Sequence, residues 1–229
     1  MQSLLVTSES NLKTAKKLFK NCAIHVIRKP PSEVPDHFNG KVIGFGGGSV
    51  IDTAKLIANP NPCYAIPTTA SGAAVTSHAV IWRKDKVDIR TPVPILDSIW
   101  KNLCIKLKKK SLERTKVDCF CHIIESTHSK KSNEVSRFNC HQAESYFMRY
   151  LMNGDMRFLI EAGNWAGRAI EITGTNFIHA ISYVLTLDYG YCHGDALKQA
   201  LDIWQFKDCR KVIEKAKCKY PKFYESTLI

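Results

Sequence analysis

The stretch KVIGFGGGSVIDTAK, residues 41–55, carries the clearest sign of how the N-terminal half is built. Its first five residues form a short run with β-branched side chains, which predicts a buried strand, and the pattern after the glycines predicts a helix over 50–58. Glycines at such a turn let the backbone approach a ligand, and the helix N-terminus offers unpaired N–H groups to a phosphate. The same glycines also suit a tight turn without any ligand. The motif is neither a Walker loop nor GxGxxG, so by itself it leaves both interpretations open.

The residues around this stretch alternate between strand and helix patterns. We expect a helix over 11–20 and further strands at 4–7, 23–27, 63–69 and 78–82. This alternation implies parallel pairing in a three-layer α/β sheet of the dinucleotide-binding type. The connection 28–40 holds three prolines and a glycine, so it is too broken for a crossover helix and the sheet should be abbreviated there. A second loop, PTTASG at 67–72, also follows a strand, and two such loops predict a ligand crevice at the sheet edge.

From about Ser111 onward the strand signals fade and apolar residues recur at helical spacing. The segments with this spacing are 117–126, 138–152, 155–172 and 177–187. The stretch TPVPILDSIWKN, residues 91–102, carries two prolines and is interpreted as the linker. We therefore predict an α/β nucleotide-binding domain over 1–102 and an all-α domain over 103–229.

The composition is that of a soluble globular protein, with 45% hydrophobic and 24% charged residues. No apolar run approaches the roughly 20 residues that span a bilayer, and the N-terminus does not resemble a signal peptide. Nine cysteines without a CxxC pair indicate reduced thiols, so we expect a cytoplasmic protein with no membrane partner. A thiolate metal site at Cys119, Cys121 and Cys192 is the alternative use of these cysteines, although CxC alone lacks zinc-ribbon spacing.

The formal net charge of +12 would attract anions such as nucleic acids, acidic membranes or phosphorylated small molecules. The densest cluster is KLKKK at 106–110, with lysines at 106, 108, 109 and 110. No nucleic-acid motif accompanies the charge, and no aromatic residue is interleaved with these lysines for base stacking. We interpret the cluster as a solvated helix face and expect no specific nucleic-acid partner.

Four residues of the helical half are candidate metal ligands. Asp118 and His122 are four residues apart, so on a helix they share one face about 6 Å apart along the axis. His179 and His193 would be about 21 Å apart on one unbroken helix, so both can bind one ion only if the chain reverses between them. Gly190 and Gly194 are the predicted places for that break. The ligand types suit Fe(II) or Zn(II). The remaining histidines are interpreted as surface or satisfied core residues: His25, His37, His78, His128 and His141.

Four blocks in this order resemble the signature blocks of the iron-containing (group III) alcohol dehydrogenases. They are GFGGGSVIDTAK, AIPTTASGAAVTSHAVIW, VDCFCHIIES and NFIHAISY…YCHGDA, and together they span roughly residues 41–197. The resemblance implies a dehydroquinate-synthase-like α/β domain followed by a helical domain, with cofactor and metal in the cleft between them.

The resemblance also implies roles for individual residues. The metal ligands would be Asp118, His122, His179 and His193, binding Fe(II), with Zn(II) as the alternative. NAD or NADP would lie against Gly46, Gly47, Gly48, Ser49, Thr68 and Thr69, and Asp52 would lie near the nicotinamide or substrate. Ser8 stands where NAD-preferring relatives often have an aspartate, so it would tolerate NADP, although the neighbouring Glu9 weakens that indication.

The chain departs from the family pattern in several places. Tyr183 takes the position of a proton-relay histidine, and a phenol with a pKa of about 10 is a poorer relay at neutral pH. Tyr183 remains a catalytic candidate, with water as the alternative route for the proton. The threonine loop is one residue shorter than usual, the family's opening segment is missing and few helices follow HGDA. We expect a homodimer to complete the cleft.

The function implied is a metal-dependent NAD(P) oxidoreductase that interconverts a small-molecule alcohol and aldehyde. The sequence AGRAIEI…HAISYVLT resembles that of the family branch that reduces phosphonoacetaldehyde to 2-hydroxyethylphosphonate. One alternative is a sugar-phosphate cyclase of the dehydroquinate-synthase type, although a glutamate would then be expected in the carboxylate–histidine pair. The other alternative is a catalytically idle relative in which the metal ion serves only to stabilise the fold.

Overall fold

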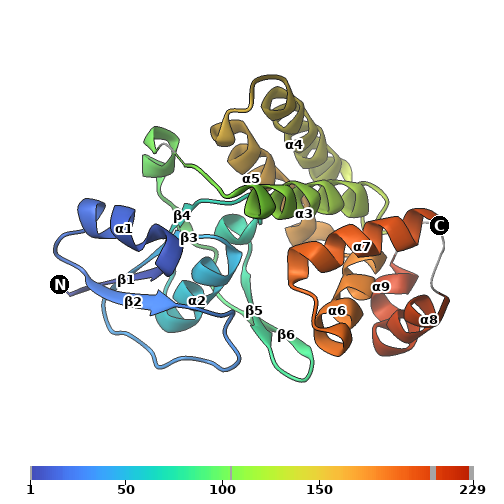
Figure 1. The fold of residues 1–229 in the computed structure, drawn as a ribbon, viewed down its shortest axis with the longest axis horizontal. Helices are drawn as coiled ribbons and strands as arrows, with labels where there is room; N and C mark the ends of the chain where they lie inside the picture. Colours follow the sequence, from blue (N-terminus) through green and yellow to red (C-terminus); the bar gives the residue numbers. More distant parts are fainter. Residues whose placement is uncertain (1, 104, 207–209, 227–229) are drawn as a thin grey trace. The chain divides into compact units, whose positions relative to one another are not determined.

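The computed structural model describes residues 2–103, 105–206 and 210–226, and the chain forms two compact units. The first unit, Met1–Ile105, contains the strands, and the second, Lys106–Ile229, is helical. In Figure 1 the strands lie in the blue-to-green part of the chain and the helices α3 to α9 follow in green to red. The predicted fold class, an α/β domain followed by an all-α domain, is confirmed.

The main sheet of the first unit has five parallel strands in the order β2-β1-β3-β4-β7. Their bounds are β1 Ser3–Ser8, β2 Ala23–Ile27, β3 Lys41–Gly46, β4 Tyr64–Pro67 and β7 Ile95–Leu96. The central strand β3 is almost entirely buried, whereas the edge strand β2 is partly exposed, as expected for a strand paired on one side only. The first four predicted strands are therefore confirmed.

Two α-helices accompany this sheet: α1 Leu12–Leu18, preceded by a short 3₁₀ turn, and α2 Gly48–Ala58. The apolar face of α2 packs Val50, Ala54 and Ile57 against Val6 of β1 and Val42 of β3. Segment 28–40 contains neither helix nor strand, so the abbreviated crossover is also confirmed. Helix α2 begins directly after the carboxyl end of β3, and the glycine turn lies between them.

The prediction for residues 78–82 was right about the strand and wrong about its partner. This strand, β5 His78–Trp82, pairs antiparallel with β6 Lys86–Arg90 in a separate two-stranded sheet. The connection 83–85 is far too short for a parallel crossover, so the chain must reverse. The fifth strand of the main sheet is instead β7, within the stretch interpreted as a linker. With two residues, β7 is too short to give a periodic signal.

The helical segments predicted for the second half of the chain are confirmed, and further helices follow them. Its helices are α3 Lys109–Thr127, α4 Glu134–Asn153, α5 Met156–Thr173, α6 Phe177–Tyr189, α7 His193–Phe206, α8 Arg210–Lys219 and α9 Pro221–Glu225. The core lies between α6 and α7, where Ile181 and Val184 pack with Leu197 and Ala200. A capping box at Asn133 begins α4.

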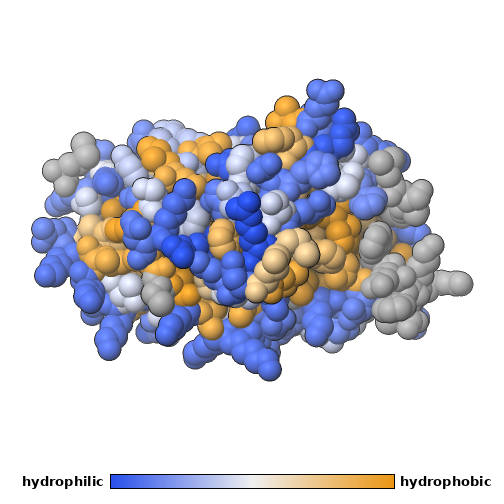
Figure 2. Space-filling model, turned by 90° about the horizontal axis from the view of Figure 1, so that it is seen from above, coloured by the Kyte–Doolittle hydropathy of each residue, from blue (hydrophilic) through white to orange (hydrophobic). Residues whose placement is uncertain are grey.

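Hydrophilic residues cover much of the face shown in Figure 2, with hydrophobic residues in patches between them. Such a mixture is normal for a folded protein surface. Among the described residues, no helix combines the length and the apolar character that crossing a bilayer requires.

Leu197 and Leu151 allow the importance of the α6–α7 core to be tested with one substitution at two sites. Leu197 is fully buried, whereas Leu151 on α4 is 55% exposed. Leu197→Ala should lower the free energy of unfolding by about 2–5 kcal/mol, because it removes buried apolar contacts and leaves a cavity. Leu151→Ala should change it by less than about 0.5 kcal/mol. Urea denaturation followed by circular dichroism measures both, and equal losses would contradict the assignment of the core.

Candidate functional site

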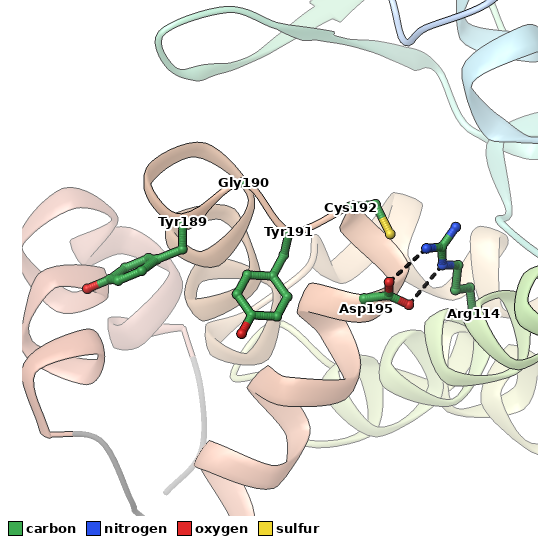
Figure 3. A pocket seen from close by; sticks show the side chains of 6 residues that line it. All are labelled: Arg114, Tyr189, Gly190, Tyr191, Cys192 and Asp195. Carbon is green, nitrogen blue, oxygen red and sulfur yellow. Dashed lines mark hydrogen bonds and ion pairs between the residues drawn. The ribbon is translucent and has the colours of Figure 1, made fainter.

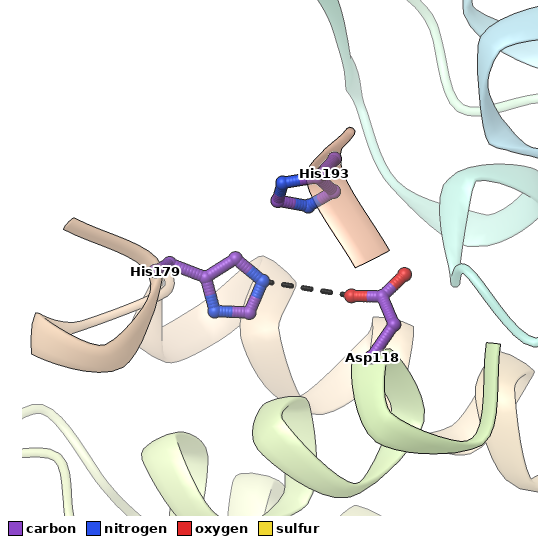
Figure 4. Close-up of side chains that lie close together, drawn as sticks. All are labelled: Asp118, His179 and His193. Atoms are coloured by element: carbon purple, nitrogen blue, oxygen red, sulfur yellow. Dashed lines mark ion pairs between the residues drawn. The ribbon is translucent and has the colours of Figure 1, made fainter. Parts of the chain in front are cut away.

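Three of the predicted metal ligands lie together in the second unit. Asp118, His179 and His193 each offer a ligand atom, and these atoms lie within 4.8 Å of one another. Figure 4 shows the three side chains converging from α3, from α6 and from the start of α7. His179 Nε2 lies 3.6 Å from Asp118 Oδ1. Residues that are 75 positions apart at the extremes thus form one compact cluster.

His122, the fourth predicted ligand, lies beside this cluster. Its Nε2 is 3.4 Å from Asp118 Oδ1, as the four-residue spacing on α3 predicts. Its ring stacks on the ring of His179, with centroids 4.8 Å apart and planes within 7°. His122 is outside the group of three that share the 4.8 Å limit, yet it contacts the same carboxylate oxygen.

A break between α6 and α7 brings His193 back towards His179. Helix α6 ends at Gly190, which adopts a left-handed conformation with φ of 74°. Helix α7 then begins at His193. The predicted break at Gly190 is confirmed, whereas the one at Gly194 is wrong, because Gly194 is the second residue of α7. Gly194 instead allows close helix packing, since a Cβ there would lie 2.5 Å from Arg114 Cβ on α3.

The polar atoms at the centre of the cluster have an unusual arrangement. His179 Nδ1 pairs at 2.5 Å with Glu125 Oε2, which as a carboxylate oxygen can only accept, so Nδ1 carries the proton. In a neutral ring this leaves Nε2 as an acceptor facing a carboxylate oxygen. Asp118 Oδ1 and His179 Nε2 are both buried and make no hydrogen bond within the described structure. A cation between two buried acceptors satisfies both of them, and a carboxylate with imidazoles is a donor set that divalent metals bind, so the residues present fit a divalent metal ion.

The ionisation of Asp118 agrees with this fit. Burial acts to raise the pKa of its carboxyl, but the positive charge that His122, His193 and His179 carry when protonated lowers it to about 2. Asp118 is therefore a carboxylate at neutral pH, which is the form that binds metals.

The first unit brings the glycine turn and the threonine loop side by side at the carboxyl ends of β3 and β4. Thr68 N–H donates to the carbonyl of Gly46 at 2.9 Å. A Cβ on Gly47 would lie 3.2 Å from Thr69 Oγ1, and one on Gly48 would lie 3.1 Å from Ser71 Oγ. A side chain at either position would be tightly packed against this loop, so glycine suits the close approach of the N-terminus of α2 to the hydroxyl-rich loop. The predicted residues Gly46 to Ser49, Thr68 and Thr69 are thus neighbours.

Two further predicted residues belong to the same unit. Ser8 ends β1, and its Oγ lies 2.9 Å from Ser10 Oγ. Asp52 lies on α2, where burial raises the pKa of its carboxyl even though Lys55 Nζ is only 3.6 Å away. Lys55 is itself buried and donates to the carbonyl of His78 at 2.7 Å. Asp52 is therefore paired with a buried cation in a desolvated position.

Known proteins share both the sequence motifs and the fold. Residues 3–96 match the family model of iron-containing alcohol dehydrogenases, and two curated relatives each align over 67% of the chain. The chain is similar to the iron-containing alcohol dehydrogenases in sequence and in fold. One relative is the 1-propanol dehydrogenase of Salmonella typhimurium, 29% identical over 179 residues, with 47% of its length covered. The other is the phosphonoacetaldehyde reductase of Streptomyces viridochromogenes, 27% identical over 195 residues, with 49% covered.

The chain thus spans about half the length of these curated relatives. Among solved structures, an iron-containing alcohol dehydrogenase from Thermotoga maritima superposes with a TM-score of 0.70 at 22% identity, over all of this chain and 77% of that one. A 1,3-propanediol oxidoreductase superposes with a TM-score of 0.69 at 22% identity, over 86% of this chain and 65% of that one. At such identities the likeness shows a common fold.

Tyr183, the catalytic candidate of the sequence analysis, is buried against the cluster. Its ring stacks on His193 with centroids 6.1 Å apart and meets His179 edge-on at 6.0 Å. Its hydroxyl lies 3.2 Å from Thr175 Oγ1. Tyr183 thus supports two histidine rings of the cluster through ring packing.

An open pocket of about 430 Å³ lies at the turn before α7 (Figure 3). It is lined by Arg114, Tyr189, Gly190, Tyr191, Cys192 and Asp195. Asp195 accepts two hydrogen bonds from Arg114, at 2.8 and 2.7 Å, and the guanidinium holds the pKa of that carboxyl below its usual range. This ion pair balances the charge of Arg114, so the guanidinium gives the pocket no unpaired positive charge with which to bind an anion.

The alternative thiolate site is not supported by the geometry. Cys119 and Cys121 are buried, and burial raises the pKa of both thiols, whereas Cys192 is exposed. Within residues 2–103, 105–206 and 210–226, the one group of three potential ligands that can hold an ion is the cluster around Asp118. Glu125 is the residue that the sequence interpretation missed, although it follows His122 by three positions within a quoted family block.

Exchanging His193 for Ala tests whether the cluster holds metal. We expect the bound metal per chain to fall by roughly tenfold or more, since even losing an outer-sphere partner of a metal ligand typically costs 10–100-fold in affinity. His141→Ala is the matched control, because the side chain of His141 is 77% exposed and pairs with Glu144 on α4. Elemental analysis of both variants after identical metal loading provides the measurement. Equal metal contents would remove His193 from the site.

Proposed function

We propose that this chain acts as a metal-dependent NAD(P) oxidoreductase that interconverts an alcohol and an aldehyde. The observation that carries the proposal is the buried pair of acceptors, Asp118 Oδ1 and His179 Nε2, 3.6 Å apart with His193 beside them. Similarity to the iron-containing alcohol dehydrogenases supports the same chemistry, and the names of the two curated relatives describe an alcohol dehydrogenase and an aldehyde reductase.

In this proposal Asp118, His122, His179 and His193 hold Fe(II), with Zn(II) as the alternative. When bound, the ion supplies Lewis acidity towards the substrate oxygen, and the nicotinamide supplies or accepts the hydride. Asp118 contributes one negative charge and the imidazoles bind as neutral donors, so the ion and its four ligands keep a net positive charge, which the buried Glu125 carboxylate beside His179 offsets. Burial of His122 and His179 excludes water from one side of the ion and strengthens its field there.

The glycine turn is the proposed pyrophosphate site. The N-terminus of α2 at Gly47, Gly48 and Ser49 offers backbone N–H groups and the positive end of the helix dipole. Thr69 and Ser71 place hydroxyl groups next to these glycines as further donors. Asp52 would act near the nicotinamide or the substrate. Its raised pKa and its buried partner Lys55 are properties of a group that can exchange a proton.

The choice between NAD and NADP depends on the end of β1. Ser8 carries no charge that would repel a 2′-phosphate. Glu9 is engaged in an exposed ion pair with Arg28 at 2.8 Å, which moderates its negative charge. We therefore propose that either nucleotide can bind.

For the substrate, we propose small aldehydes and in particular phosphonoacetaldehyde. The two curated relatives are named for 1-propanol and for phosphonoacetaldehyde, which differ in charge. The net charge of +12 favours the anionic compound.

The direct test is metal analysis of the purified chain together with NADH and NADPH oxidation over a panel of aldehydes. The panel contains propanal and phosphonoacetaldehyde. We expect turnover of at least one aldehyde, loss of turnover with a chelator and recovery with added Fe(II) or Zn(II). A metal-replete chain without turnover on any aldehyde would instead indicate the catalytically idle relative.

Replacing Tyr183 by Phe and by Ala separates a proton relay from ring support. Tyr183→Phe keeps the ring against His193 and removes only the hydroxyl, so we expect kcat within about threefold of the unaltered chain. Tyr183→Ala removes the ring and should reduce bound metal. If kcat of Tyr183→Phe fell by about 100-fold or more while its metal content stayed constant, the phenol would be the general acid–base group.

A further inference from the structure

Glu125 is a buried carboxylate on α3 whose two oxygens both bind His179. It is 3% exposed and lies one helical turn beyond His122. Oε1 accepts the backbone N–H of His179 at 2.9 Å, and Oε2 accepts the ring Nδ1–H at 2.5 Å. A buried carboxylate is costly unless its oxygens are bonded, so this two-point contact is what stabilises Glu125 there.

The backbone contact replaces a missing helix cap. His179 is the third residue of α6, where N–H groups have no partner within the helix. The side chain of Asn176, at the N-cap position, makes no cap hydrogen bond. It donates instead to the backbone carbonyl of Glu125 at 2.7 Å and accepts from Ser226 Oγ at 2.5 Å. Glu125 therefore fixes the start of α6 from the neighbouring helix.

The ring contact determines which nitrogen of His179 carries the proton. A carboxylate oxygen can only accept, so Nδ1 must donate, and in the neutral, metal-binding form of the ring Nε2 keeps its lone pair. That lone pair is directed at the region of Asp118 Oδ1, 3.6 Å away. A helix cap alone would need one carboxylate oxygen, and the second oxygen serves only the ring.

We propose that Glu125 is the positioning residue of the metal site, holding His179 in the Nδ1–H tautomer and fixing its ring so that Nε2 binds the ion. This inference rests on the metal site of the proposed function. Carboxylate partners of this kind orient histidine ligands and raise their basicity.

The variant Glu125→Gln tests the proposal without changing the volume of the side chain. If the amide oxygen keeps the helix cap, its NH₂ group faces Nδ1, and the ring proton must move to Nε2. If the amide oxygen keeps Nδ1–H instead, NH₂ faces the backbone N–H of His179 and the cap is lost. In neither orientation can the amide keep both the helix cap and the Nδ1–H tautomer of His179.

The measurement is Co²⁺ titration of the metal-free chain, with affinity from chelator competition and ligand geometry from the visible absorption bands. For Glu125→Gln we expect Co²⁺ affinity to fall by about 10–100-fold with altered bands. Ser126→Ala is the matched control. Ser126 is the next residue, fully buried, and its hydroxyl accepts from Thr173 Oγ1 at 3.1 Å and not from His179. It should lower the melting temperature and keep the wild-type affinity and bands.

The outcomes distinguish a failure of the role proposed for Glu125 from a failure of the proposed metal site. Wild-type affinity and bands in Glu125→Gln would overturn the role of Glu125 while the metal site stands. Equal loss of Co²⁺ affinity in Ser126→Ala would also overturn it, because the effect would then be general destabilisation. Failure of the unaltered chain to bind Co²⁺ would overturn the proposed metal site and this inference together.

A second measurement needs no variant. In the ¹⁵N-histidine spectrum of the zinc-loaded chain, one of the 8 histidines should show an Nδ1–H proton at unusually low field, with the metal on Nε2. The absence of such a resonance would overturn the proposal even if Glu125→Gln failed to fold.

Discussion

The helical unit depends on one electrostatic constraint, the meeting of two buried hydrogen-bond acceptors. Asp118 Oδ1 and His179 Nε2 lie 3.6 Å apart without a hydrogen bond, and Nδ1 of the same imidazole is engaged by Glu125. Left alone, two desolvated acceptors are unfavourable, because each loses its water without gaining a donor. A cation removes the conflict, and a divalent ion with imidazole and carboxylate ligands does so with the atoms already present.

Much of the surrounding structure serves to hold these atoms. The left-handed Gly190 ends α6, so His193 can begin α7 next to His179. Tyr183 packs between the histidine rings and the aromatic side chains of Tyr220 and Phe223. These last two residues lie at and near α9, so the C-terminal helices stabilise the site through ring contacts. Rigid support of this kind is what a ligand set needs to hold its geometry.

The sequence predicted the parts of this arrangement that depend on short-range spacing. Asp118 and His122 could be paired because four residues on a helix determine their relative position. Gly190 could be proposed as a helix end because glycine adopts the left-handed conformation without a steric penalty.

Glu125 was missed because its partner His179 is 54 residues away, and no local sequence pattern indicates such a contact. Gly194 was misinterpreted for the same reason, since its requirement comes from the approach of Arg114 on another helix. In the α/β unit, β7 gives no sequence signal because two residues carry no periodicity. The alternation of strands and helices predicts parallel pairing for β5, but the short reversal at 83–85 makes its actual pairing with β6 antiparallel.

X-ray absorption at the metal edge of the loaded chain tests the central claim most directly, because it reports the ligand atoms themselves. With zinc bound, the account predicts only nitrogen and oxygen neighbours at about 2.0–2.2 Å, together with the outer-shell scattering of several imidazole rings. Sulfur neighbours at about 2.3 Å, or a shell without imidazole scattering, would contradict it, because the ion would then be held by residues other than Asp118 and its histidines.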